Sequence, residues 1–258
     1  MYSISAVIIT FNEEQNIKRC LNSLAGVVDE VVIVDSFSTD GTSSVVNSLI
    51  DSFMSINFIE REWEGYSSAK NFGNQVAKGK YILSIDADEE LDKELRTSIS
   101  ELILDGSSYQ FNRKNYLEGK WIKYCGWYPD KKLRLFPKGS ALWKGDFVHE
   151  ELIAEHASTL LQGHLNHYTA KNKEKHLETI RKYSTLNAQS YIRRGKNYTF
   201  VKSLLQAIAV FVKIYILKQG FRDGHIGWKI AWRSAYGRIL RYKEYVRLKE
   251  DHSFESSR

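Results

Sequence analysis

The first 110 residues alternate between short, nearly continuous apolar runs and longer segments with helical spacing of apolar residues. Short apolar runs between turn signals predict buried strands, whereas apolar positions three and four apart predict helices. The predicted strands are 5–10, 30–34, 57–59 and 81–85, and the predicted helices are 13–24, 42–50 and 67–77. Buried strands that alternate with helices are typical of a mostly parallel sheet covered on both faces.

From Tyr109 onward the pattern changes. Short runs at 133–136 and 141–143 predict antiparallel strands, and helical spacing returns at 171–195 and at about 227–249. Between these helices the segment 199–219 is strongly apolar, but Lys202 and Lys213 interrupt it. Its uncharged core is therefore shorter than the ~20 residues that a membrane span needs. We expect an α/β domain at 1–170 and a basic, amphipathic helical extension at 171–258.

Charge is distributed unevenly along the chain, whose net charge is +6. Residues 1–110 contain 8 Lys/Arg and 18 Asp/Glu, whereas residues 111–258 contain 29 Lys/Arg and 13 Asp/Glu. This asymmetry indicates that the C-terminal half faces an anionic partner: a membrane surface, a nucleic acid or a phosphorylated substrate. Only Cys20 and Cys125 are present, and the first strand leaves no room for a signal peptide, so we expect a reducing, cytoplasmic location.

Asp86-Ala87-Asp88 directly follows the predicted strand 81–85. The loops after the first two strands, 10–14 and 35–42, are also acidic or polar. Ligands of open α/β sheets bind at the carboxyl ends of parallel strands, where these three loops meet. Two neighbouring carboxylates repel each other unless a cation lies between them, and Mg²⁺ or Mn²⁺ would also bind a diphosphate. The pattern predicts a nucleotide site, although Asp86-Ala87-Asp88 alone could equally be an acidic turn before a helix that begins near Asp92.

These segments resemble family-2 inverting glycosyltransferases, which have the GT-A nucleotide-diphospho-sugar transferase fold, a mostly parallel Rossmann-like sheet flanked by helices. The matching segments are 8–14, 29–36, 40–42 and 86–89. Further segments resemble the branch that contains lipopolysaccharide-core β-1,4-glucosyltransferases: 126–130, 133–136, 148–150, 167–169 and 220–224. The resemblance divides the first domain into a nucleotide-binding half, 1–110, and an acceptor half, 111–170.

The resemblance also implies roles for individual residues. Thr10, Asn12 and Glu13 would line a uridine pocket, and Asp35 would contact the base. Lys70 would approach the base or the diphosphate, and Asp86, next to Ala87, would hold the ribose. Asp88 would bind the metal, and His167 would be a further ligand of the metal or the diphosphate. Glu150 would be the catalytic base.

Several assignments rest on residue chemistry and stay open. Glu151 and Asp146 are rivals of Glu150 as the base, and His149 is a weaker candidate ligand than His167. Trp127 and Tyr128 could stack on a sugar ring, whereas Trp143 is expected to pack in the core. Arg134 could balance the diphosphate charge or form a salt bridge with Asp130 or another acid.

We therefore expect a metal-dependent transfer of a hexose, with glucose and UDP-glucose as the first candidates. The acceptor would be a lipid-linked or envelope glycan such as lipopolysaccharide core, or else a polyprenyl phosphate or a protein. The chain could also be a non-catalytic nucleotide-sugar scaffold. A nucleotidyltransferase is disfavoured because its first loop is usually rich in glycine, and 11–14 contains none.

The basic C-terminal helices suit a peripheral position at the cytoplasmic face of the inner membrane. They could instead cap the catalytic domain or form a homo-oligomer. Nucleic-acid binding is not expected, because the apolar stripe from Phe200 to Leu217 fits it poorly.

Overall fold

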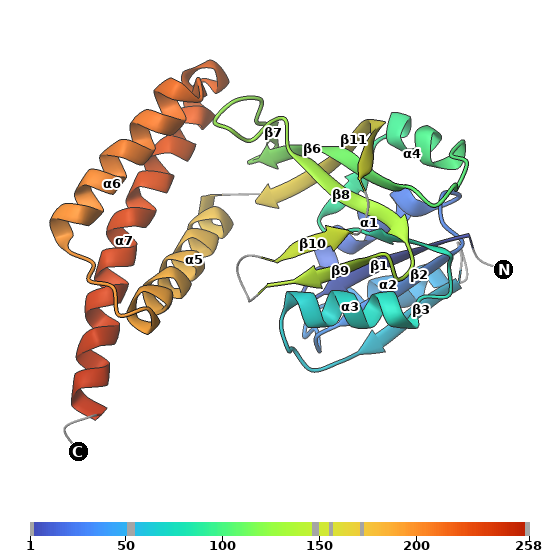
Figure 1. Cartoon of the computed structure of the whole chain (residues 1–258), viewed down its shortest axis with the longest axis horizontal. Helices are drawn as coiled ribbons and strands as arrows, with labels where there is room; N and C mark the ends of the chain where they lie inside the picture. Colours follow the sequence, from blue (N-terminus) through green and yellow to red (C-terminus); the bar gives the residue numbers. More distant parts are fainter. Residues whose placement is uncertain (1–2, 51–54, 146–149, 155–156, 171–172, 256–258) are drawn as a thin grey trace. The chain divides into compact units, whose positions relative to one another are not determined.

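The computed structural model describes residues 3–50, 55–145, 150–154, 157–170 and 173–255 and divides into two compact units (Figure 1). The first unit comprises Met1–Lys114 and Asp130–His167, and the second comprises Asn115–Pro129 and Tyr168–Arg258. The segment 115–129 is therefore grouped with the C-terminal helices. The expected domain boundary at residue 170 remains a prediction.

The N-terminal part of the first unit confirms the predicted alternation of strands and helices. Strands β1 (Ile4–Thr10), β2 (Glu30–Asp35), β3 (Ser55–Glu60) and β4 (Tyr81–Ser84) lie parallel in the order β3-β2-β1-β4. Helices α1 (Glu14–Leu24), α2 (Thr42–Ile50) and α3 (Tyr66–Val76) connect them. Thr10 is in register with Asp35, so the ends of β1 and β2 present their loops side by side.

Two hydrophobic cores fix the helices on opposite faces of this sheet. In β1, Ala6 and Ile8 pack with α1, α2 and α4 (Lys93–Ser100), whereas Val7 packs with α3. This alternation follows from the strand period of two, because successive side chains point to opposite faces. Helix α1 buries one stripe, formed by Ile17, Cys20, Leu21 and Leu24. Both faces of the strands are therefore apolar, and polar residues remain at the strand ends.

Antiparallel strands extend the sheet beyond β4, as expected from residue 109 onward. The full order is β3-β2-β1-β4-β8-β6-β11-β5, and β7 pairs with β6. The added strands are β5 (Glu89–Leu91), β6 (Ser108–Leu117), β7 (Lys120–Trp121), β8 (Lys131–Pro137) and β11 (Ser158–Ala170). β9 (Ala141–Lys144) and β10 (Glu151–Ala154) form a separate antiparallel pair. The pairing of β5 with β11 sets His167 opposite Glu89, next to the Asp86–Asp88 turn.

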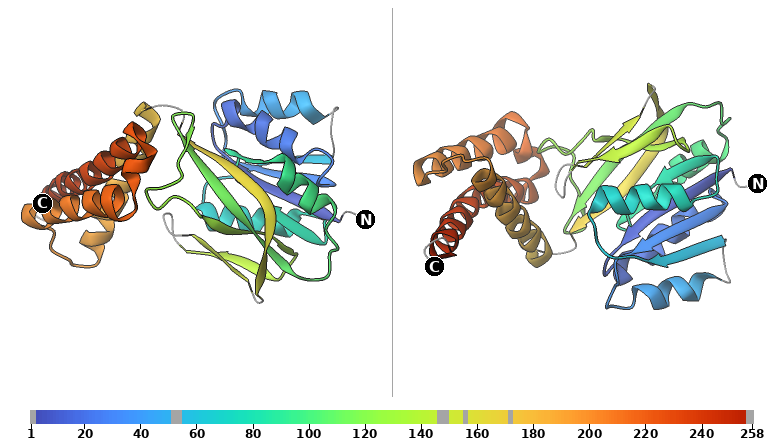
Figure 2. Two further views of the ribbon diagram at one scale, coloured as in Figure 1. Left: turned by 90° about the horizontal axis from the view of Figure 1, so that it is seen from above. Right: turned by 60° about the horizontal axis from the view of Figure 1, so that its bottom comes forward.

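The second unit is built around the long helix α7 (His225–Glu255), which packs along α5 (Lys173–Arg193) and α6 (Phe200–Val212) (Figure 2). α6 begins at Thr199, whose side chain accepts a hydrogen bond from the Lys202 amide, and continues into the π-helical turn η1 (Lys213–Leu217). A short 3₁₀ turn, η2 (Gly220–Asp223), precedes α7.

The core of this unit joins segments that are distant in sequence. Leu117, Ile122 and Cys125 of the 115–129 segment pack with Ile226 and Ile230 of α7. The Asp223 carboxylate accepts hydrogen bonds from the Lys123 and Tyr124 amides at 3.1 and 2.9 Å. Cys20 and Cys125 are both buried free thiols, as expected for a chain without a disulfide framework.

Candidate functional site

The first two strand ends form a hydrogen-bonded corner at the carboxyl edge of the parallel sheet. The Thr10 hydroxyl donates to the Asp35 carboxylate at 2.6 Å. Asp35 also accepts from the amide and the hydroxyl of Ser38 at 2.7 and 2.6 Å. Thr10 and Asp35 are buried. Thr10 and Asp35, the two polar residues expected near the nucleobase of the donor, therefore have a fixed orientation.

The loop after β1 is tied to the loop after β2 along its length. Asn12 has a left-handed backbone with φ of 58°, which asparagine tolerates better than most residues. Its amide donates to the Ser38 hydroxyl, and its side-chain carbonyl accepts from the Thr39 amide, both at 2.8 Å. The Glu13 amide donates to the Thr42 hydroxyl at 2.8 Å. The structure thus brings Thr10, Asn12, Glu13 and Asp35 together.

Asp86 lies between two cations at the end of β4. The Lys70 ammonium is 2.9 Å from one carboxylate oxygen, and the Arg134 guanidinium is 2.8 Å from the other. Burial alone would raise the pKa of Asp86, but Lys70 and Arg134 outweigh it and hold that pKa well below its usual range. Asp86 is therefore an anion with a fixed geometry, as a ligand for ribose hydroxyls would need to be.

A buried ion network supports this turn and was not predicted from the sequence. Glu89 is fully buried and accepts from Arg134 at 2.7 Å and from Arg113 at 3.1 Å. Its second oxygen accepts the Asp86 amide at 3.0 Å. Burial would lower the pKa of Arg134, but Glu89 and Asp86 raise it overall. Arg134 thus forms salt bridges with Asp86 and Glu89. A salt bridge with an acid was one of its two predicted roles, and balancing the diphosphate charge stays a prediction.

The two residues expected to hold a metal are neighbours. The His167 Nε2 atom lies 3.2 Å from the Asp88 carboxylate, and both side chains are partly buried. Burial would lower the pKa of His167, but the Asp88 charge raises it overall. One carboxylate oxygen and one imidazole nitrogen at hydrogen-bond distance are a donor set that Mn²⁺ or Mg²⁺ accepts when the remaining ligands are phosphate oxygens and water. The described residues therefore fit a divalent cation at this position. Ala87, between Asp86 and Asp88, is buried in the core.

A second acidic group, at the start of α4, has a structural role. Asp92, Glu94 and His164 have ligand atoms within 4.8 Å of one another. Asp92 is the N-cap of α4 and accepts from the Leu95 amide at 2.9 Å, and Glu94 is exposed. Asp92 thus performs the helix-capping role that the sequence suggested for this acidic stretch.

Glu150 lies in the first unit, immediately before β10. The phenol of Tyr66, at the start of α3, has its pKa raised by burial and then by the charges of Glu150, Asp86 and Glu13. The charges of these three carboxylates therefore act on one partly buried phenol. Glu151, a rival candidate for the base, is exposed and lies opposite Lys144 in the β9–β10 pair. The rival base Asp146 and the candidate ligand His149 lie outside the described residues.

Trp143 of β9 holds the β9–β10 pair against α3. Its amide donates to the Asn71 side chain at 3.0 Å, and its carbonyl accepts from the same side chain at 2.9 Å. The Lys70 ammonium lies 4.2 Å from the centre of the Trp143 ring. Trp143 is buried, as predicted, and it also orients Lys70 toward Asp86.

Trp127 and Tyr128 belong to the second unit, whereas Thr10, Asp35 and Asp86 belong to the first. Trp127 is partly buried against the core of that unit, and Tyr128 packs edge-on against Trp121 at 5.5 Å. Their predicted contact with a sugar ring remains a prediction.

The sequence matches the family model described as Glycosyl transferase family 2 over residues 5–137. It is 32% identical to the lipopolysaccharide core biosynthesis glycosyltransferase LpsC of Rhizobium meliloti, covering 95% of this chain and 92% of that protein. It is 29% identical to an uncharacterised glycosyltransferase of Rickettsia typhi, over 93% of this chain and 86% of that one.

The fold is also found among solved structures. The mannosyltransferase PcManGT from Pyrobaculum calidifontis, in complex with GDP-Man and Mn²⁺, aligns with a TM-score of 0.54 and 14% identity, over 95% of this chain and 87% of that one. This likeness, together with the mixed sheet and its flanking helices, confirms the predicted GT-A fold.

Proposed function

Because the chain belongs to glycosyltransferase family 2 and is a glycosyltransferase, we propose that it transfers a hexose from a nucleoside diphosphate sugar with inversion at the anomeric carbon. UDP-glucose is the first candidate donor. The observation that carries the proposal is the clustering of Asp86, Lys70 and Arg134 beside the Asp88–His167 pair at the carboxyl edge of the sheet.

The proposed reaction is a single displacement. An acceptor hydroxyl oxygen forms a bond to C1 of the sugar while the bond from C1 to the diphosphate oxygen breaks, and the nucleoside diphosphate leaves. Glu150 accepts the proton of the attacking hydroxyl, a role that a positioned carboxylate can perform. After burial, the charges of Glu150 and Asp86 both raise the pKa of the Tyr66 phenol, and this shared effect supports the assignment.

Asp88 and His167 would hold Mn²⁺ or Mg²⁺, which when bound supplies positive charge to the leaving diphosphate. The Mn²⁺ and GDP-Man bound by the mannosyltransferase support this assignment. Thr10 and Asp35, joined by their hydrogen bond, would contact the nucleobase, and Asn12 and Glu13 lie in the adjoining loop. Asp86, held as an anion by Lys70, would accept hydrogen bonds from ribose hydroxyls.

We infer that the acceptor is a glycan of the bacterial envelope, with lipopolysaccharide core as the first candidate. The support is the activity of the Rhizobium meliloti relative, which aligns along nearly its whole length. An acceptor of this kind is anchored in lipid. The enzyme would therefore work in the cytoplasm at the inner face of the inner membrane, as a peripheral protein.

The experiment is a turnover assay with the full chain, UDP-glucose, Mn²⁺ and a truncated lipopolysaccharide acceptor, followed by measurement of released UDP and of the product. We expect release to require both the acceptor and the metal. Glu150→Gln should lower kcat by at least ~100-fold while KM for the donor changes little, because a general base acts in the transition state.

Glu151→Gln is the matched control and should stay within a few-fold of the wild type. A Glu150→Gln enzyme with unchanged kcat would remove Glu150 from the mechanism. Donor binding without turnover on any envelope acceptor would favour the non-catalytic scaffold instead.

A further inference from the structure

Helix α6 and the turn η1 carry a broad apolar face that the second unit does not cover. The stretch Phe200–Leu217 has a mean hydropathy of 1.8, yet only 11% of it is buried. By length and composition it could cross a membrane, whereas a core helix of the same composition would be mostly buried. The large exposed side chains are Phe200, Val201, Leu204, Leu205, Ile208, Val212, Ile216 and Leu217, with exposed fractions from 38% to 70%. Apolar patches of this kind mark interaction surfaces.

The charge around this face has one sign. Residues 179–222 contain nine Lys/Arg and no Asp/Glu. Lys202, Lys213 and Lys218 are exposed within or beside the apolar stretch. The combination of an apolar stripe with flanking cations is complementary to an anionic lipid surface, which offers acyl chains below a layer of phosphates.

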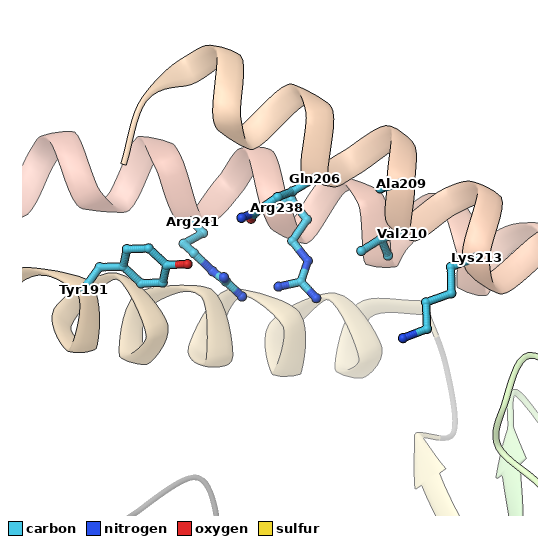
Figure 3. A pocket seen from close by; sticks show the side chains of 7 residues that line it. All are labelled: Tyr191, Gln206, Ala209, Val210, Lys213, Arg238 and Arg241. Carbon is cyan, nitrogen blue, oxygen red and sulfur yellow. The ribbon is translucent and has the colours of Figure 1, made fainter. Parts of the chain in front are cut away.

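Three of the cations of this unit line a cavity on the flank of α6. The cavity, of about 300 Å³, lies among α5, α6 and α7 and is lined by Lys213, Arg238 and Arg241 together with Tyr191, Gln206, Ala209 and Val210. In Figure 3 the Arg238 and Arg241 side chains extend from α7 toward α5 into this space.

These cations lack an acidic partner among the described residues. No ion pair joins Lys213, Arg238 or Arg241 to a carboxylate in that part of the chain, and the Arg241 guanidinium lies 5.8 Å from the centre of the Tyr191 ring. Burial and the charge of Arg241 lower the pKa of Arg238. Adjacent guanidinium groups repel each other, so an anion between them would relieve an unfavourable interaction.

We propose that α6 and η1 form the membrane-contact surface of this enzyme and that the Lys213–Arg238–Arg241 cavity binds the phosphate of an anionic lipid. The exposed apolar side chains enter the upper acyl region, and the guanidinium groups donate charge-assisted hydrogen bonds to the lipid phosphates. Trp228 and Trp232, which are exposed and stacked on each other, add side chains of the type that favours the membrane interface.

The contact lies in the plane of the interface and does not span the bilayer. Gln206, Ala209 and Val210, at the middle of α6, line the same cavity as Arg238 and Arg241. A helix that crossed the bilayer would carry both guanidinium groups to the hydrocarbon centre, which is costly for any charged side chain. α6 also buries Ser203 and Ala207 against its own unit, so it has one free face.

The test is sedimentation of the full chain with vesicles of phosphatidylcholine alone and with phosphatidylglycerol added, without any nucleotide sugar. We expect binding to the anionic vesicles that weakens with salt. Leu205→Ser with Ile208→Ser should weaken binding at least tenfold. Arg238→Gln with Arg241→Gln should weaken it on the order of tenfold or more, and only on anionic vesicles.

Matched controls remove the same groups elsewhere. Ile103→Ser removes an exposed isoleucine of the first unit, and Lys18→Gln with Lys80→Gln removes two exposed cations there. Both controls should bind as the wild type does. Arg238→Lys with Arg241→Lys keeps the charge and should restore most of the binding, and circular dichroism melts check that each variant is folded.

Equal vesicle binding by the wild type, Leu205→Ser/Ile208→Ser and Arg238→Gln/Arg241→Gln would overturn the proposal. So would a change from dimer to monomer in Leu205→Ser/Ile208→Ser without loss of vesicle binding, since this face would then be an interface between copies. If the membrane-bound protein resists carbonate extraction, α6 spans the bilayer and does not lie in its interface. Binding is measured without donor, so Asp88→Ala should bind vesicles normally even if the proposed transfer reaction fails.

Discussion

At the scale of single residues, the Asp86–Asp88 turn depends on Glu89, whose side chain is completely buried. Glu89 joins two guanidinium groups and the Asp86 amide. Its removal leaves the buried Arg134 with Asp86 as its carboxylate partner and the partly buried Arg113 with Asp130. Breaking a buried ion pair in this way costs far more than losing an exposed pair. The proposed donor site therefore depends on a residue that need not touch the donor.

Glu89→Ala should lower the free energy of unfolding by about 3–5 kcal/mol. The neighbouring Glu90 is the matched control, because it is half-exposed and its ion pair to Arg19 is 3.9 Å long. Glu90→Ala should cost at most about 1 kcal/mol. Urea unfolding of both variants measures the difference, and equal losses would mean that the Glu89 network contributes no special stability.

The residues predicted from local motifs lie where the strand pattern placed them, because the ends of parallel strands meet at one sheet edge. Arg113 and Tyr66 were not predicted as members of the site. Their positions depend on the pairing of β6 with β8 and on the packing of α3, which leave no local signature. Glu89 had a usable signal, since it stands directly after Asp88 in the matching segment 86–89.

At the scale of elements, β11 passes closely over the first turn of α4. A Cβ built at Gly163, whose φ is +92°, would lie 2.2 Å from the Leu95 amide nitrogen. This glycine allows β11 to reach β5 and to set His167 beside Asp88. The proposed metal position therefore depends on a close backbone approach four residues earlier in the same strand.

Gly163→Ala should destabilise the fold by at least about 3 kcal/mol, because a clash with backbone adds to the strain of a positive φ. Gly139 is the matched control: its φ is +89°, and no heavy atom of the described residues lies within 4 Å of a Cβ built there. Gly139→Ala should cost about 1 kcal/mol. Thermal unfolding compares the two variants. Equal shifts in melting temperature would show that the contact of residue 163 with α4 adjusts without a cost in stability.

Element type followed from periodicity for the long segments, including every predicted strand and helix of the first 85 residues. The short strands β5 and β7 carry no such signal, since three or two residues cannot show a period. The π-helical turn η1 was likewise not predicted, because its residues continue the apolar pattern of α6.

At the scale of the whole molecule, the second unit contains a histidine whose protonation opposes folding. His176 is buried, and its Nδ1 atom lies 2.9 Å from Arg233, which can only donate. Burial and then the charge of Arg233 lower the pKa of His176 to about 4. The neutral form is therefore the one that the folded chain accepts.

The pKa of His176 in the folded chain lies below its unfolded value near 6.5. The contribution of His176 to the free energy of unfolding is therefore complete above pH 6.5 and is lost as the pH falls toward 4. We expect His176→Gln to reduce the loss of unfolding free energy over this range by on the order of 2 kcal/mol. His225→Gln, at an exposed position, should leave the profile unchanged. Urea unfolding at several pH values measures it, and parallel profiles for His176→Gln and wild type would refute the assignment.

The unequal charge of the two halves predicts an anionic partner for the C-terminal part, and this stays a prediction. The grouping of 115–129 with the C-terminal helices was not predictable. It depends on contacts such as Gly220 with Cys125, where a Cβ would lie 2.9 Å from the thiol. Such contacts join residues far apart in the chain and leave no periodic trace.

The most direct measurement is the melting temperature of the full chain with a panel of nucleotide sugars, with and without Mn²⁺, for wild type and Asp88→Ala. A ligand that binds only the folded state raises the melting temperature as its concentration exceeds Kd. We predict that one nucleotide sugar stabilises the wild type in a Mn²⁺-dependent manner and that Asp88→Ala loses this effect. The absence of stabilisation by every nucleotide sugar, or its persistence in Asp88→Ala, would contradict the proposed donor site.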